Sequence, residues 1–311
     1  MNINVSIIIC CHNSATRVKS TLDYLAKQEQ EYLNLEVILV DNNSSDDTIE
    51  VANEKWKELL TPFPLRVIKE KQLGLSNARK TGVLTALGEI IIFCDDDNWL
   101  SENYLSEAYN LLNSNKSIFG VCGYCEPVAK VNLPNWFEEY SQIYACGAPQ
   151  IEDEMSKELY TLRGAGMAVR SDVIKDLYNS GIVHFSSDRK GQSLSSGGDD
   201  EISFWLRALG GKLLYSENLK LKHFMEESRM NVEYRNRLEA GIKMSTKSLR
   251  SSVRIMTKSI QKVNKRDCIN LFRFNDDGYI ARLKFGFYGK NNPYQTNMLK
   301  LESLKFKYSL K

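Results

Sequence analysis

The first hundred residues alternate between short apolar runs and segments with helical spacing of their apolar positions. The runs are almost continuously apolar, which is typical of strands buried on both faces. Strands that alternate with helices in this way predict an α/β fold, with a mostly parallel central sheet and helices on both faces. The expected strands are 5–11, 35–40, 65–69 and 89–94, and the expected helices are 15–27, 47–60 and 74–87. Ser14 is expected to cap the first helix.

The pattern is mixed between residues 100 and 225 and becomes helical and basic after that. We expect helices over 101–112 and 200–209, strand-like segments over 119–131 and 212–215, and a loop that runs into a strand over 164–170. The chain is therefore predicted to have two parts. Residues 1–227 form an α/β domain, and residues 228–311 form a basic, mainly helical C-terminal extension.

Charge is distributed unevenly between these two parts. The whole chain carries 41 basic and 39 acidic residues, a net charge of +2. Residues 228–311 hold 19 of the basic and 6 of the acidic residues, a net charge of +13, which leaves 22 basic and 33 acidic residues, or −11, in residues 1–227. An acidic body with a basic tail indicates either two activities or one body with a docking surface.

Polar clusters follow three of the predicted strands. Cys11-His12-Asn13 follows the first strand, Asp41-Asn42-Asn43 the second, and Asp95-Asp96-Asp97 the strand at 89–94. Ligands of open α/β sheets bind beyond the carboxyl ends of the strands. The three clusters are therefore expected to converge on one crevice.

The strongest chemical signal is the run of three carboxylates, Asp95, Asp96 and Asp97. Adjacent carboxylates raise one another's pKa unless a cation lies nearby. A Mg²⁺ ion with substrate phosphates resolves this repulsion, and Mn²⁺ accepts the same ligands. The alternative is a solvated acidic turn before the next helix. The position directly after an apolar strand favours the metal interpretation.

Two further segments carry weaker signals. A carboxylate at Asp41 could accept a hydrogen bond from a nucleobase N–H, or it could be only a turn residue. Gly74 precedes a helix whose N-terminus would favour an anion, and Arg79 could reach a phosphate or the base. Arg79 could equally be an ordinary solvated helix residue.

Cysteine usage and hydropathy point to a cytoplasmic protein. The seven cysteines include a lone Cys122-x-x-Cys125 pair and no double CxxC zinc pattern, so we interpret them as reduced, mostly buried residues. The first residues show no basic region of a signal peptide. The apolar runs fall short of the roughly 18 residues that span a bilayer, so membrane contact is expected to be peripheral.

The order of the motifs resembles glycosyltransferase family 2, the inverting enzymes of GT-A fold. The resemblance covers about residues 5–225. Its motifs are the opening strand 5–13, the nucleoside-binding turn Val40–Thr48, the helix start Gly74–Arg79, the DxD-like Asp95-Asp96-Asp97, the acceptor-side loop Gly164–Arg170 and the base motif Gly197-Gly198-Asp199-Asp200.

The resemblance implies transfer of a sugar from a metal-bound nucleotide-diphosphate sugar to an acceptor hydroxyl, with inversion. Residues 1–227 would be the catalytic domain, with Mn²⁺ or Mg²⁺ as cofactor. Asp97 would bind the metal, and the acceptor would be a saccharide or a lipid-linked saccharide of bacterial surface synthesis. The donor-binding residues implied are Cys11, Asn13, Asp41, Asn43, Asn77, Arg79, Asp95 and Asp96.

Two assignments stay open within this resemblance. Alignment on Arg207-Ala208-Leu209-Gly210 places Asp199 at the position of the catalytic base, and a shift of one residue would select Asp200. His223 matches a late histidine that often joins the metal in this fold, but it could be an ordinary strand residue. His12 is expected to have no catalytic role.

Two other classes remain as alternatives. A sugar-phosphate nucleotidyltransferase would use the same sheet and carboxylates, but it needs a glycine-rich loop after the first strand, and residues 10–17 contain no glycine. A non-catalytic relative that only binds glycans would not need both Asp95-Asp96-Asp97 and Asp199-Asp200.

The basic extension interleaves large apolar residues with lysine and arginine, which fits a segment lying on an anionic membrane surface. Packing of these helices on the catalytic body is the alternative. Nucleic acid is not an expected partner, because the chain shows no recognised binding motif.

Overall fold

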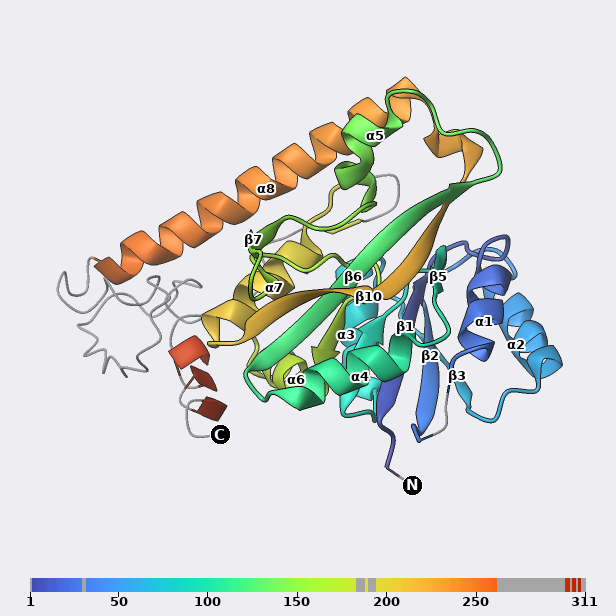
Figure 1. The fold of residues 1–311 in the computed structure, drawn as a ribbon, viewed down its shortest axis with the longest axis horizontal. Coiled ribbons are helices and arrows are strands. Elements are labelled where there is room, and N and C mark those ends of the chain that lie inside the picture. The colour runs from blue at the N-terminus through green and yellow to red at the C-terminus, as the bar shows by residue number, and fades with distance from the viewer. Residues whose placement is uncertain are drawn as a thin grey trace.

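The computed structural model describes residues 2–29, 32–182, 188–189 and 194–261, and near the C-terminus 300–302, 304–305 and 307–308 (Figure 1). Within α8 (Val232–Gln261), residues 248–261 are described by their backbone alone. Residues 262–299 of the predicted basic extension lie outside the described residues.

The described residues form one 10-stranded mixed sheet in the order β3-β2-β1-β4-β9-β6-β10-β8-β7, with β5 paired to β10. β1, β2, β3 and β4 are parallel, whereas β9 is antiparallel to β4 and to β6. The strands are β1 (Val5–Cys11), β2 (Leu35–Asp41), β3 (Leu65–Lys69), β4 (Ile90–Phe93), β5 (Asn98–Leu100), β6 (Ile118–Ala129), β7 (Ile151–Asp153), β8 (Glu158–Leu159), β9 (Ala168–Arg170) and β10 (Lys212–Met225).

Two apolar cores lie on opposite faces of the sheet. Successive side chains of a strand point to opposite faces, and Ile7 of β1 accordingly belongs to one core while Ile8 belongs to the other. α1 (Val18–Ala26), α2 (Thr48–Leu59) and α4 (Tyr104–Ser114) contribute to the first core, and α3 (Leu75–Thr85), α6 (Ser171–Asn179) and α7 (Gly198–Ala208) to the second. The predicted sheet with helices on both faces is confirmed.

Most predicted elements recur with small changes at their ends, and β3 has the expected bounds. β10 was expected to end at residue 215 but continues to Met225. The polar stretch after Tyr215 resembles a turn in sequence. In the structure the strand continues through it, and only the register of its pairing with β6 shifts, between Ser216 and Lys220. The prediction that Ser14 caps the first helix is wrong, because α1 begins after Arg17 and the Ser14 hydroxyl donates to Asp96 instead.

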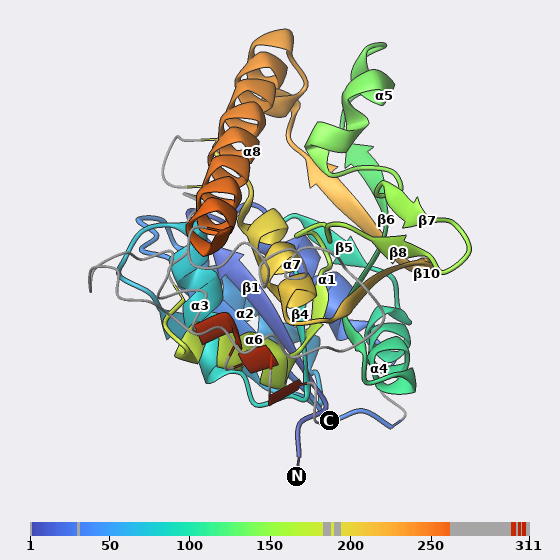
Figure 2. The ribbon, with the colours of Figure 1, turned by 90° about the vertical axis from the view of Figure 1, so that its left-hand side faces the viewer.

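The far ends of β6 and β10 extend beyond the body and lead into α5 (Phe137–Tyr140) and η2 (Glu227–Arg229) (Figure 1). α8 rises beside this extension, as the side view shows (Figure 2). A short helix, η1 (Ser141–Tyr144), follows α5. Leu238 of α8 and Leu301 near the C-terminus are buried in the two cores of the body.

These contacts show that parts of the predicted extension pack on the body, and the helix expected after residue 225 is confirmed for residues 232–261. The boundary at residue 227 stays a prediction. None of the helices in the described part of the chain combines the length and apolarity that crossing a bilayer requires.

Candidate active site

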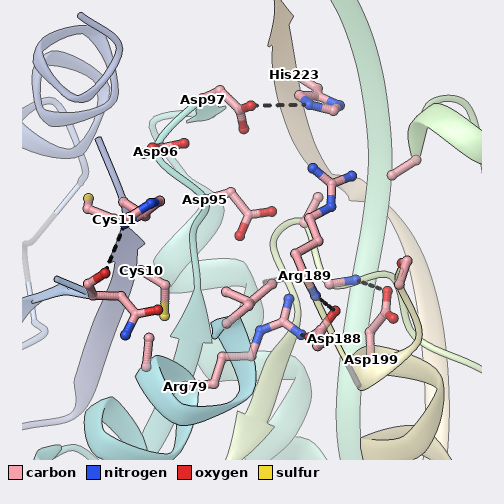
Figure 3. Close-up of a pocket in the computed structure, with 18 of the residues that line it drawn as sticks. Cys10, Cys11, Arg79, Asp95, Asp96, Asp97, Asp188, Arg189, Asp199 and His223 are labelled. Carbon is pink, nitrogen blue, oxygen red and sulfur yellow. Dashed lines mark hydrogen bonds and ion pairs between the residues drawn. The ribbon is translucent and has the colours of Figure 1, made fainter. Parts of the chain in front are cut away.

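A cavity of about 350 Å³ opens beyond the carboxyl ends of β1, β2 and β4, where the sequence predicted a crevice (Figure 3). α3, α7 and η1 contribute to its walls, and α8 closes one side with Tyr234, Leu238 and Ile242. Its polar and thiol-bearing lining residues are Cys10, Cys11, His12, Arg17, Asn42, Arg79, Asp95, Asp96, Asp97, Asp188, Arg189, Ser196, Asp199, His223 and Arg229.

The three carboxylates that follow β4 have different surroundings. The carboxylate of Asp96 is engaged within the protein, because it accepts hydrogen bonds from Ser14 and from Arg17, the latter at 2.8 Å. Burial raises the pKa of Asp96, and the charge of Asp97 adds to this effect. Burial also raises the pKa of Asp95, which the charge of Arg79 partly offsets. Asp95 is therefore the carboxylate that is better placed to meet a ligand.

Asp97 lies opposite two cationic side chains. Its Oδ2 is 3.0 Å from Nη1 of Arg229. The same oxygen is 3.5 Å from Nε2 of His223 (Figure 3). β10 pairs antiparallel with β5 so that His223 faces Asn98, the residue after Asp97, and this register brings the imidazole to the carboxylate.

Attraction between Asp97 and its cationic partners His223 and Arg229 offsets the desolvation cost of burying these charges. Burial alone would raise the pKa of Asp97, but His223 and Arg229 hold it well below its ordinary value. Burial lowers the pKa of His223, but the Asp97 carboxylate outweighs that effect and raises the pKa to about 10. Beside Asp97 the His223 ring keeps both of its protons near neutral pH, so a metal ion bound here would have to displace one of them. A carboxylate and a neutral imidazole are ligand types that Mn²⁺ accepts.

Asp199 stands at the start of α7 and lines the cavity. The N–H of Gly164 donates to its Oδ2 at 2.9 Å, and the N–H of Asp200 donates to its Oδ1 at 3.1 Å. Both oxygens are therefore oriented by the backbone, and the helix N-terminus favours their negative charge. Asp200 is not among the residues that line the cavity in the described part of the chain.

Arg79 is deeply buried and forms an ion pair with Asp188, at 3.0 Å between Nη1 and Oδ2. Its burial rules out the alternative that it is an ordinary solvated helix residue. The guanidinium also lies over the ring of Phe93, 5.7 Å from the ring centroid. Arg79 is therefore held rigidly at the cavity wall.

Four residues predicted to bind the donor do not line the cavity. Asn13 and Asn43 are exposed and adopt positive φ angles of 51° and 59°, and Asn13 accepts a hydrogen bond from the N–H of Ser45. Asn77 donates to the carbonyls of the loop before its helix. Asp41 is buried at the end of β2, and its Oδ1 has no hydrogen-bond partner among the described residues.

Several cavity residues had not been singled out from the sequence. Arg17 follows the first polar cluster by four residues, and Arg229 follows His223 by six. Their position after a recognised motif is the only feature of the sequence that could have indicated a place in the cavity. Asp188 lies in a polar segment with no periodicity. His12 was expected to have no catalytic role; it lines the cavity, and its Nδ1 lies 2.9 Å from the carbonyl of Asn42.

The chain is similar in sequence and in fold to known glycosyltransferases. A cholesterol galactosyltransferase of Borreliella burgdorferi is 35% identical over 115 residues, which are 36% of this chain and 30% of that protein. Among solved structures, Staphylococcus aureus TarS 1–349 in complex with UDP-GlcNAc has a TM-score of 0.53 at 16% identity, covering 99% of this chain and 92% of the other.

A mannosyltransferase from Pyrobaculum calidifontis, in complex with GDP-Man and Mn²⁺, has a TM-score of 0.53 at 18% identity, covering 98% of this chain and 70% of the other. A family model described as Glycosyl transferase family 2 matches residues 6–177. The chain has the GT-A fold and belongs to glycosyl transferase family 2.

Proposed function

We propose that the protein transfers a sugar from a nucleoside diphosphate sugar to an acceptor hydroxyl, with inversion at the anomeric carbon. The observation that carries the proposal is a single cavity lined by Asp95, Asp97, His223 and Asp199. The carboxylates proposed to bind the donor and the metal, Asp95 and Asp97, therefore line the same cavity as the proposed base, Asp199. Its volume of about 350 Å³ is within the range of small-molecule sites.

The nucleoside would lie at the ends of β1 and β2. Asp41 has one buried oxygen without a partner among the described residues, and an unpaired buried acceptor is costly unless a donor meets it. Asp41 is one residue before Asn42, which lines the cavity, and a base N–H that reached past Asn42 would supply that donor. Asp95 would accept from the ribose, since Asp96 is already occupied by Arg17 and Ser14.

Asp97 and His223 would hold the divalent ion, Mn²⁺ or Mg²⁺. Their fit is supported by the 3.5 Å between the carboxylate Oδ2 and Nε2 of the imidazole, and by Mn²⁺ in the mannosyltransferase neighbour. An ion bound there would act as a Lewis acid that stabilises the charge on the departing diphosphate. Arg229 and Arg17 lie beside Asp97 and Asp96 and would add positive charge on the same side.

Asp199 would take the proton of the acceptor hydroxyl. The hydrogen bonds from the backbone of Gly164 and Asp200 fix the carboxylate plane, so the base needs little reorganisation when the hydroxyl approaches. Proton transfer requires the hydroxyl oxygen to come within about 3 Å of a carboxylate oxygen. Arg79 and Asp188, which pair beside it, keep that wall of the cavity in place.

The acceptor would be a saccharide or a lipid-linked saccharide of bacterial surface polysaccharide synthesis. The TarS neighbour was solved with UDP-GlcNAc, and the relative from Borreliella is named for galactosyl transfer to cholesterol, so acceptor chemistry varies among the proteins that this chain resembles. We place the protein in the cytoplasm, with residues 228–311 as a candidate contact to the anionic inner face of the membrane. The net charge of +13 in that segment supports this placement.

The test is release of nucleoside diphosphate from a panel of UDP- and GDP-sugars with Mn²⁺, with and without a saccharide acceptor. Asp199→Asn should lower the acceptor-dependent rate by roughly 10²–10⁴, the usual share of general-base catalysis, while donor affinity changes little. Asp200→Asn is the matched control and should retain most of the rate, because Asp200 does not line the cavity.

Other outcomes select another function. Pyrophosphate release from a nucleoside triphosphate and a sugar phosphate would identify a nucleotidyltransferase. Glycan binding without turnover of any donor would identify a non-catalytic relative. Full activity of Asp199→Asn with loss of activity in Asp200→Asn would exchange the two assignments.

A further inference from the structure

Two buried cysteines and His223 lie together behind the proposed donor-metal site. Cys125 is on β6 and Cys146 follows η1, and one ligand atom from each of the three residues lies within 4.8 Å of the other two. Cys125 is 1% exposed and Cys146 is 0% exposed, whereas His223 reaches the cavity surface. The proposed transfer reaction uses neither thiol.

The backbone brings these residues together through strand pairing. An antiparallel bridge joins Cys125 to Gly147, the residue after Cys146. On the other side, β10 pairs with β6 so that Leu221 faces Cys125, and His223 lies two residues farther along, on the same face of the sheet. Three segments distant in sequence therefore converge on one point.

The loop that carries Cys146 is held in place. Arg163 donates from Nη1 to the carbonyls of Ala145, at 3.1 Å, and Gly147, at 2.6 Å. The carbonyl of Tyr144 accepts from the Cys146 thiol at 3.4 Å and lies 3.0 Å from Nδ1 of His223. The thiol and the imidazole are thus oriented by a shared acceptor, and the nearby guanidinium offsets negative charge on the sulfurs.

This donor set differs from that of the proposed donor-metal site. Two thiolates and an imidazole favour thiophilic ions such as Zn²⁺, whereas carboxylates favour Mg²⁺ and Mn²⁺. In a tetrahedral zinc site, ligand bonds of about 2.0–2.3 Å place neighbouring ligand atoms roughly 3.3–3.8 Å apart. Because the ligand atoms lie within 4.8 Å of one another, they need to approach by at most about 1–1.5 Å to reach that spacing. Three protein ligands leave a fourth position for water.

We propose that Cys125, Cys146 and His223 form a second metal site, for a thiophilic ion such as Zn²⁺, and that filling it withdraws His223 from Asp97. Binding displaces three protons to solvent, one from each thiol and one from the His223 imidazolium, so two thiolates balance the charge of the ion and the imidazole is neutral. A neutral imidazole has one nitrogen lone pair. His223 can therefore serve the thiol pair or a metal at Asp97, but not both. Only the competition between the two metal sites for His223 rests on the proposed function.

The experiment measures metal binding on the full chain, kept reduced with a phosphine and without any donor sugar. Equilibrium dialysis should show about one tightly held Zn²⁺ per chain. With Co²⁺ as the probe, the same site should give thiolate-to-cobalt charge-transfer absorption and the visible bands of a tetrahedral ion.

Variants separate this site from other thiols. Cys146→Ala and, independently, Cys125→Ala should weaken Zn²⁺ binding by about tenfold or more and remove the charge-transfer band, since even loss of an outer partner costs 10- to 100-fold in affinity. Cys122→Ala is the matched control, because Cys122 is buried in the same strand but belongs to the core on the other face of the sheet. Circular dichroism checks that each variant is folded.

Equal Zn²⁺ affinity in the parent and in folded Cys146→Ala or Cys125→Ala would overturn the proposal. So would cobalt binding without a thiolate band, or a Cys125–Cys146 disulfide that persists in the reduced sample. Because no donor is present, these results are independent of whether the protein transfers a sugar. Competition for His223 is supported if added Zn²⁺ lowers the Mn²⁺ affinity of the parent but not that of Cys146→Ala. It is refuted if the parent and Cys146→Ala have the same Mn²⁺ affinity in the presence of Zn²⁺.

Discussion

The buried ion pair between Arg79 and Asp188 offers a direct test of the cavity wall. Arg79 is 5% exposed and Asp188 is 7% exposed. Arg79→Met keeps most of the side-chain volume but removes the guanidinium. The carboxylate of Asp188 is then left buried without its cation, and we expect a large loss of stability.

The magnitude follows from the separation of the pair. Two unit charges 3.0 Å apart attract each other by about 5.5 kcal/mol at an effective dielectric constant of about 20. Removing one partner of a buried ion pair typically costs about 3–5 kcal/mol. At about 2–4 °C per kcal/mol, the melting temperature of Arg79→Met should fall by about 6–20 °C.

The assay is urea and thermal unfolding followed by circular dichroism, without ligands. Lys80→Met is the control, because Lys80 is the next residue of α3 and is exposed, so its loss should change the free energy of unfolding by about 0.5 kcal/mol or less. The double variant Arg79→Met/Asp188→Asn should be more stable than Arg79→Met alone, because it removes the uncompensated charge.

The dependence on pH has a definite sign. Burial raises the pKa of Asp188 above the ordinary 3.8, against the influence of Arg79, and removal of Arg79 should raise it further. An acid whose pKa is raised on folding stabilises the protein when protonated, and that stability is lost as pH rises through the raised pKa. The loss of unfolding free energy in Arg79→Met relative to the parent should therefore become smaller as pH falls from 7 towards 4. A deficit below about 1 kcal/mol at pH 7, or a double variant no more stable than the single one, would refute this reasoning.

Three further outcomes are expected. Asp41→Asn should weaken binding of a nucleoside diphosphate by about tenfold or more in calorimetry, since hydrogen bonds to charged groups contribute roughly 1.5–3 kcal/mol; unchanged affinity would remove Asp41 from the base site. Chelation with EDTA should abolish sugar transfer and added Mn²⁺ should restore it, whereas full activity in EDTA would contradict a metal at Asp97. Co-sedimentation with anionic vesicles should occur for the full chain and weaken with salt, because exposed charges are screened beyond about 8–10 Å; equal sedimentation with neutral vesicles would exclude electrostatic docking of residues 228–311.

The amino-acid sequence determined the parts of this protein that depend on local pattern. Continuous apolar runs predicted β1 to β4, and the polar residues that follow them predicted where the cavity lies. Carboxyl ends of parallel strands share one edge of a sheet, so Asp95 to Asp97 and Cys11 were placed correctly without knowledge of the packing. The same logic placed Asp41 at a strand end, but it could not show that one of its oxygens lacks a partner among the described residues.

Only the tertiary structure decided which side chains meet. His223 reaches Asp97 because β10 continues past its polar interruption and pairs with β5, and the sequence predicted that β10 would end at residue 215. Asp199 rather than Asp200 lines the cavity because the first turn of α7 directs it towards Gly164. Contacts such as Arg229 with Asp97, or Cys125 with Cys146, join segments with no common periodicity. Their positions depend on strand register and helix packing across the whole domain, and local hydrophobic patterns do not predict either.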